Sequence, residues 1–128
     1  DTLKSFSGAF SWRMDGKNPG SPALVASFEN LNIEGSFRLV ASAKAWLTPG
    51  SDAALYVVVE REGKSIWRRT VRCSEMIAQH QAWTTVMLAA EPDIQPQADD
   101  ILKVFFWIEG DKALWLDDFG VEVYKGLK

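Results

Sequence analysis

The residues of this chain that could do chemistry are tryptophans placed among charged side chains. Trp46 alternates with Lys44 and Arg38 along one stretch, so the three would share one face of a β-strand. An aromatic ring stacks on the flat C–H patches of a sugar, while polar neighbours bond the hydroxyl groups. Such a face could bind a carbohydrate, or it could pack beneath a loop or against another domain.

A second aromatic group follows the same pattern later in the chain. Trp107 shares its face of a predicted strand with Lys103 and Glu109, and Tyr56 alternates with apolar residues in a third strand. If these strands are neighbours, one sheet face carries Trp46, Tyr56 and Trp107 among charges. We therefore predict one ligand-binding face, made of Trp46, Trp107, Tyr56, Arg38, Lys44, Lys103 and Glu109.

The adjacent carboxylates Asp117 and Asp118 form the other candidate constellation. Neighbouring residues of a strand point to opposite faces, so the two are not expected to act as the acid/base pair of a glycosidase. A carboxylate here could instead accept backbone N–H bonds at a strand bulge. The sequence contains no G-x-S-x-G, P-loop or G-x-G-x-x-G motif, and we expect no enzyme.

The strand residues 65–73 contain the basic run Arg68-Arg69-Thr70-Val71-Arg72. These cations could bind an anionic ligand such as an acidic sugar. They could equally protect an exposed edge strand against pairing with another chain. We favour the second interpretation from the sequence.

The composition fits one globular domain over residues 1–128, either a mature protein or a domain excised from a larger one, since the chain begins at Asp1. The net charge of −3, from 14 basic and 17 acidic residues, excludes a strongly basic nucleic-acid footprint. No segment is apolar for long enough to cross a bilayer. The lone Cys73 excludes an internal disulfide, and the lone His80 excludes a metal centre built on several histidines.

Period-two alternation predicts eight short strands and almost no helix. The strands are expected at residues 10–14, 23–28, 37–47, 54–60, 65–73, 82–90, 101–109 and 114–124, with a helical turn within 74–81. This spacing predicts an all-β antiparallel sandwich, and a jelly roll is the simplest way to hide the sheet edges. Trp12, Trp67 and Trp83 are expected in the core or half-buried, Trp83 as core, while Trp115 is left open.

Four segments, in order, resemble those of galactose-binding-like modules, a jelly-roll group that includes carbohydrate-binding modules of glycoside hydrolases. They are residues 7–11 (SGAFS), 38–47 (RLVASAKAWL), 83–86 (WTTV) and 113–121 (ALWLDDFGV). The resemblance implies a jelly roll and a non-catalytic binding role with carbohydrate as ligand. It also implies a periplasmic, cell-surface or secreted location. The opening strand that usually precedes the first segment is missing or much shortened here.

The resemblance further implies that Asp117 and Asp118 help to hold a structural Ca²⁺ with backbone carbonyls of the opening strand. No other cofactor is expected. The alternative function is a structural or protein-interaction module of a larger cell-envelope or secreted protein, with no small-molecule ligand. In that case the aromatic face docks another domain of the parent protein.

Overall fold

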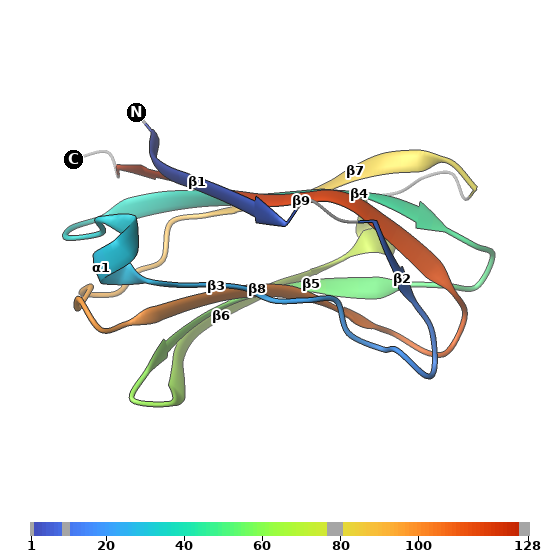
Figure 1. The fold of residues 1–128 in the computed structure, drawn as a ribbon, viewed down its shortest axis with the longest axis horizontal. Helices are drawn as coiled ribbons and strands as arrows, with labels where there is room; N and C mark the ends of the chain where they lie inside the picture. Colours follow the sequence, from blue (N-terminus) through green and yellow to red (C-terminus); the bar gives the residue numbers. More distant parts are fainter. Residues whose placement is uncertain (1, 9–10, 77–80, 126–128) are drawn as a thin grey trace.

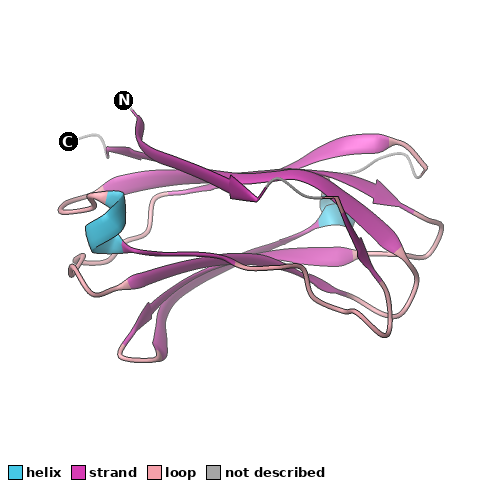
Figure 2. Ribbon diagram, viewed as in Figure 1, coloured by secondary structure: helices cyan, strands magenta, loops and turns pink. Residues whose placement is uncertain are grey.

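The computed structural model describes residues 2–8, 11–76 and 81–125, which form two stacked antiparallel sheets (Figure 1). Sheet A contains, in spatial order, β1 (Thr2–Gly8), β9 (Leu114–Lys125), β4 (Phe37–Leu47) and β7 (Trp83–Ala90), and β2 (Trp12–Met14) also pairs with β9. Sheet B contains, in spatial order, β3 (Leu24–Ser27), β8 (Ile101–Ile108), β5 (Ala53–Arg61) and β6 (Lys64–Arg72). The helical residues described are confined to α1 (Phe28–Leu31) and the 3₁₀ turn η1 (Cys73–Glu75) (Figure 2).

The strand order defines a jelly roll. We count β1 and β2 together as one opening strand, which gives eight strands in all. The first strand then pairs with the eighth (β1 with β9), and the second pairs with the seventh (β3 with β8). The third strand pairs with the sixth (β4 with β7), and the fourth pairs with the fifth (β5 with β6). This is the pattern of a long antiparallel hairpin wrapped into two sheets. The predicted all-β sandwich of jelly-roll type is therefore confirmed.

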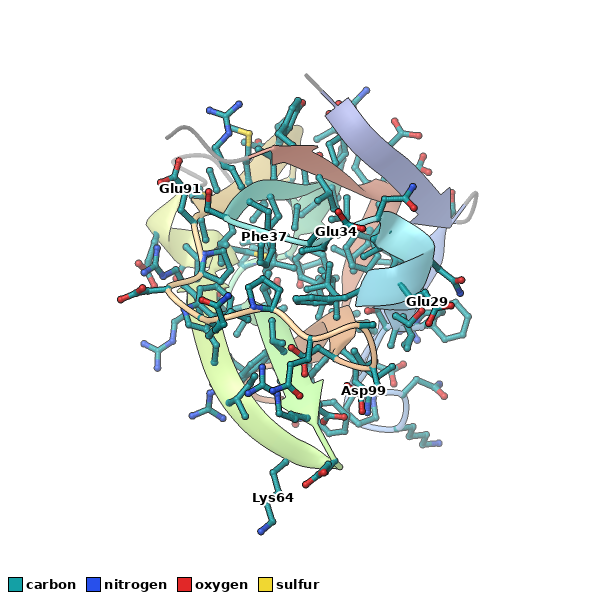
Figure 3. All side chains as sticks on the ribbon, turned by 90° about the vertical axis from the view of Figure 1, so that its left-hand side faces the viewer. Glu29, Glu34, Phe37, Lys64, Glu91 and Asp99 are labelled. Atoms are coloured by element: carbon teal, nitrogen blue, oxygen red, sulfur yellow. The ribbon has the colours of Figure 1, made fainter. Side chains whose placement is uncertain are left out.

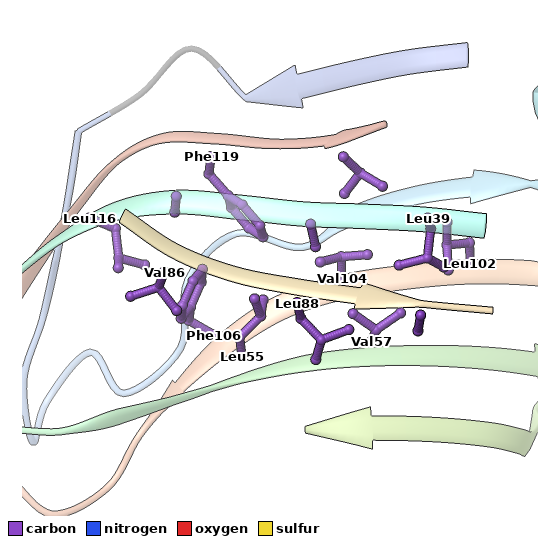
Figure 4. Close-up of a cluster of buried hydrophobic side chains, with 14 of the residues drawn as sticks. Leu39, Leu55, Val57, Val86, Leu88, Leu102, Val104, Phe106, Leu116 and Phe119 are labelled. Atoms are coloured by element: carbon purple, nitrogen blue, oxygen red, sulfur yellow. The ribbon is translucent and has the colours of Figure 1, made fainter. Parts of the chain in front are cut away.

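The strand β4 shows how the sequence determines the layers. Its odd-numbered residues from Phe37 to Leu47 are all buried, whereas the even-numbered ones are exposed or half-buried. The central positions of this buried face are small alanines, Ala41, Ala43 and Ala45. The corresponding side chains of both sheets fill the space between the layers (Figure 4), and Trp67 packs against this core as a partly buried residue.

Two predicted elements differ from the structure. A strand not predicted from the sequence, β1, lies before residue 10 and pairs with β9, while the predicted strand at 10–14 is reduced to β2 among the described residues. Of the helical turn predicted within 74–81, the described residues show only its start, in η1. Residues 77–80, including His80, lie outside the described residues.

A buried ion pair holds the loop between β7 and β8. The Asp100 side chain is completely buried and accepts hydrogen bonds from Arg61 Nε at 2.8 Å, Arg61 Nη2 at 2.9 Å and the Gln97 backbone N–H at 2.9 Å. The Arg61 guanidinium, followed by the Gln97 N–H, holds the Asp100 pKa below its usual value although burial opposes this. The Asp100 carbonyl also accepts from the first residue of α1, Phe28, at 2.8 Å.

Figure 3 looks onto this end of the sandwich, where Glu91 and Asp99 mark the two ends of the loop and Lys64 projects from the β5–β6 hairpin. The Arg61–Asp100 pair therefore joins a strand of sheet B, the loop from sheet A and the helix α1. Within the described residues, no helix combines the length and apolar character required to cross a membrane.

Candidate functional site

Three tryptophans form a row across the outer face of sheet A. Trp46 of β4 lies directly opposite Trp83 of β7 on one side and Trp115 of β9 on the other. Residues opposite one another in adjacent strands lie on the same face of the sheet, with the strands about 4.8 Å apart. The pairing register therefore gathers residues from three distant parts of the sequence into one tryptophan row.

The tryptophan row lines an open cavity of about 340 Å³. Trp83 is 48% exposed, whereas Trp46 and Trp115 are half-buried. The rings of Trp46 and Trp83 meet edge to face, with centroids 5.7 Å apart and planes at 69°. The rings of Trp46 and Trp83 are therefore not coplanar, and with Trp115 they line a shallow, widely open hollow on the surface of the sheet.

An arginine closes one end of the tryptophan row. Arg13 of β2 lies opposite Trp115, and its guanidinium lies over that ring at 5.8 Å from the centroid. Asp15 pairs with the same guanidinium and accepts from the backbone N–H groups of Asn18 and Lys17, both at 2.9 Å. These bonds, from Asn18 first, lower the Asp15 pKa, so the carboxylate remains charged and orients Arg13.

A polar row lies next to the tryptophans. Lys44 of β4 stands opposite Thr85 of β7 and Asp117 of β9, and its ammonium group lies 3.5 Å from a carboxylate oxygen of Asp118. Donors and acceptors of both charges therefore lie in the row of residues next to the tryptophans, whereas the cavity itself is lined by the three indoles. Aromatic rings with polar groups nearby suit a sugar, since its rings have apolar faces and its hydroxyl groups need partners.

The two aspartates depart from simple alternation because β9 contains a bulge. Three residue steps of β9, from Asp117 to Gly120, oppose only two steps of β4, and Asp118 has a left-handed φ of 53°. The neighbours Leu116 and Phe119 are both buried, so neither aspartate faces the core. The expectation that Asp117 and Asp118 point to opposite faces was therefore wrong.

Asp117 uses its carboxylate locally. Its Oδ1 accepts from the Asp118 backbone N–H at 2.9 Å, the bulge bond that the sequence analysis offered as an alternative to a metal site. Among the described residues, no group of three or more His, Cys, Asp and Glu side chains is placed to hold a metal ion. A calcium ion at Asp117 and Asp118 stays a prediction, which would need backbone carbonyls as most of its ligands.

The structure divides the seven predicted ligand-binding residues between two surfaces. Trp46 and Lys44 belong to the site on sheet A. Arg38 is also on this face, over the Tyr124 ring at 4.8 Å, but eight residues from Trp46, roughly 26 Å along the strand. The remaining four lie on strands or strand ends of sheet B: Tyr56, Lys103, Trp107 and Glu109. The single face that joined Trp46 to Trp107 is not formed, because β4 and β8 belong to different sheets.

Sequence reasoning missed two residues of the tryptophan row. Trp83 was expected in the core but is among the most exposed large apolar residues, and Trp115 was left undecided. The signal for Trp83 was present in its strand, since Val86 and Leu88 are buried and Trp83 has the opposite parity. Trp115 likewise lies between two buried leucines.

Comparison with known proteins identifies no family for this chain. No family model and no curated protein matches the sequence. Among solved structures, the chain is similar to the CBM22-1 xylan-binding domain from Paenibacillus barcinonensis Xyn10C, with a TM-score of 0.47, 14% identity, and coverage of 99% of this chain and 97% of that one. The jelly-roll assignment rests on the strand order of this chain.

Proposed function

We propose that this chain is a non-catalytic carbohydrate-binding module whose ligand enters the cavity of the tryptophan row on sheet A. The observation that carries the proposal is the meeting of Trp46, Trp83 and Trp115 around one open cavity, next to a row of charged residues. In this role the indole rings pack on the C–H faces of the sugar. Lys44, Asp118 and Arg13 bond its hydroxyl groups.

The angle between the rings favours a short stretch of sugar over a long flat surface. Trp46 and Trp83 meet edge to face with their planes at 69°, so they do not form one flat stacking platform. A ring that enters between them contacts one indole by its face and the other by its edge. We therefore propose that one or two sugar units, rather than an extended crystalline surface, occupy the site.

The competing proposal is a protein-interaction module that docks a neighbouring domain through the same face. Protein-docking surfaces have a well-packed apolar centre depleted of charged groups. Here the Arg13 guanidinium lies over the Trp115 ring, and the ion pair of Lys44 with Asp118 lies in the next row of the sheet. Charges this near the aromatic centre support a hydroxylated ligand. A carbohydrate-binding role also agrees with a periplasmic, cell-surface or secreted location, which we propose with it.

Affinity electrophoresis and calorimetry with a panel of soluble neutral polysaccharides test the proposal. The expected result is saturable binding of at least one member, weakened about tenfold or more in Trp83→Ala and Trp46→Ala, since a few central aromatic residues dominate such sites. The matched control is Met87→Ala, because Met87 is 49% exposed on the same strand and face. Equal affinity in Trp83→Ala and Met87→Ala would overturn the proposed site.

A docking module predicts a different pattern. None of the neutral polysaccharides would bind, and a protein partner would be released by Trp83→Ala. That combination would replace the carbohydrate proposal with the protein-interaction function.

A further inference from the structure

The strand β6 concentrates positive charge in a chain that is negative as a whole. Its nine residues include Lys64, Arg68, Arg69 and Arg72 and no acidic residue, whereas the whole chain has a net charge of −3. The strand is one of the two edge strands of sheet B. Charged side chains on an edge strand discourage pairing with another chain whichever face of the sheet they point to. Edge protection alone therefore does not explain which face of the sheet an arginine occupies.

The pairing register sorts the three arginines between two faces. Arg68 lies opposite Val58 and Arg72 opposite Ala54, both on the outer side of sheet B, whereas Arg69 lies opposite Val57, which faces the core. Arg69 accordingly leans over the inward-packed Trp67, at 5.6 Å from its ring centroid. Two of the arginines thus share the outer face with the neighbouring strands β5 and β8.

Those neighbouring strands present an aromatic strip on the outer face. The rings of Tyr56 and Phe105 stack with centroids 5.1 Å apart and planes at 11°. Trp107, two residues beyond Phe105, is 49% exposed and lies opposite Ala54. Since Ala54 lies in turn opposite Arg72, the aromatic strip and the arginines form one continuous surface.

A glycine fixes the position of Trp107. Gly20 forms an isolated bridge with Trp107, and a Cβ atom on Gly20 would lie only 2.9 Å from ring atoms Cε3 and Cζ3. The Trp12 indole N–H donates to the Gly20 carbonyl at 3.1 Å and so helps to hold this segment. The indole therefore rests against backbone on one side while half of its surface remains open to solvent.

Most cations on this face have carboxylate partners, and one does not. Lys103 lies 2.8 Å from Glu60, and Arg72 lies 3.4 Å from Glu109 in an exposed pair. Arg68 is exposed and has no ion-pair partner among the described residues. Because the Arg72–Glu109 pair is exposed, exchange of its carboxylate for one from a ligand changes the free energy little.

From these observations we infer that the outer face of sheet B is a second binding surface, for a polysaccharide that carries carboxylate groups. The sugar rings stack on Trp107 and the Tyr56–Phe105 pair. Arg68 and Arg72, four residues and about 13 Å apart along β6, bind carboxylates at separate positions of the polymer. This surface is independent of the tryptophan row on sheet A, so each can fail without the other.

Calorimetry with polygalacturonate at about 0.15 M salt, where the screening length is about 8 Å, tests the inference. Binding is expected for the wild type, and Arg68→Ala and Trp107→Ala are each expected to weaken it about tenfold. Arg68→Glu, an exposed substitution that retains the packing, should abolish it, and thermal unfolding verifies that each variant is folded. Trp83→Ala should bind polygalacturonate as the wild type does.

The matched control is Arg69→Ala, which removes the same charge from the adjacent position on the opposite face. Its affinity should stay within about twofold of wild type, because screened surface charges act weakly at a distance. Equal losses in Arg68→Ala and Arg69→Ala would overturn the inference in favour of net charge alone. The inference would also be overturned if the wild type did not bind polygalacturonate, or if it bound the methyl-esterified polymer with the same affinity. A third contrary result is binding of duplex DNA as tight as that of polygalacturonate and unaffected by Trp107→Ala.

Discussion

The substitution Asp100→Ala should strongly destabilise the fold without altering the ligand sites. The carboxylate is completely buried and accepts three hydrogen bonds, two of them from the Arg61 guanidinium. Removal of one partner from a buried pair costs about 3–5 kcal/mol. Because 27% of the Arg61 side chain is exposed and can regain water, we expect a smaller loss of about 2–3 kcal/mol in the free energy of unfolding.

The corresponding shift in melting temperature follows from the length of the chain. At an unfolding entropy of about 2.1 cal/mol/K per residue, 128 residues give about 0.27 kcal/mol per degree. The expected decrease in Tm is therefore about 7–11 °C. Thermal and urea unfolding followed by circular dichroism and tryptophan fluorescence measure it.

The adjacent Asp99 provides the control, since its side chain is exposed. Asp99→Ala should change the free energy of unfolding by less than about 0.5 kcal/mol. If Asp100→Ala is no more destabilising than Asp99→Ala, the interpretation of the Arg61–Asp100 pair is refuted.

The same pair predicts the acid response of the fold. The Asp100 pKa is lowered in the folded state, so the pair contributes fully above the unfolded value of about 3.9 and its contribution is lost as the pH falls through the lowered folded value. Asp100→Asn should therefore be less stable than wild type at neutral pH, and this difference should shrink below about pH 4. A constant difference across that range would contradict the assignment.

Three further predictions concern single residues. Cys73 is buried, and burial raises the pKa of its thiol to about 12. A thiol reagent should therefore label Cys73 only as fast as the protein unfolds. Rapid labelling of the native protein would refute this prediction. Gly20→Ala should leave Tm nearly unchanged, but the added Cβ displaces the Trp107 ring. It should therefore shift the Trp107 fluorescence and weaken polygalacturonate binding. An unchanged fluorescence spectrum would contradict the contact between Gly20 and Trp107. The φ of Asp118 is 53°, in the left-handed region that glycine tolerates and β-branched residues do not. Asp118→Gly should therefore be neutral or stabilising, and Asp118→Val should lower the free energy of unfolding by about 1–2 kcal/mol. Urea unfolding measures both variants, and equal stability of the two would refute backbone strain at this bulge.

The layers of this fold could be predicted because they depend on alternation, which is local. Every second residue of β4 is apolar and buried, and Trp46 and Lys44 were correctly expected on the opposite face. The eight predicted strands, bounded by turn residues, were sufficient to indicate a sandwich. The exception is β1, whose residues lack the strong alternation of β4.

The candidate site could be predicted only in part because it depends on which strands pair. Trp46 and Trp107 each had the right composition around them, but nothing in the sequence states that β4 and β8 lie in opposite sheets. The tryptophan row exists because residues 46, 83 and 115 are aligned across three strands. A bulge at Asp117 and Asp118 could be offered only as an alternative, since its presence depends on the register between β9 and β4.

The most direct test of the proposed function is a titration of the protein with oligosaccharides prepared from the neutral polysaccharides of the panel. It is followed by the indole N–H signals in ¹H–¹⁵N spectra. The six tryptophans give six separate reporters. We predict that the signals of Trp46, Trp83 and Trp115 shift together and saturate, while that of Trp67, which packs against the core, stays unchanged. If no oligosaccharide shifts these three signals, or if the changes are confined to tryptophans outside the row, sugar binding at sheet A is contradicted.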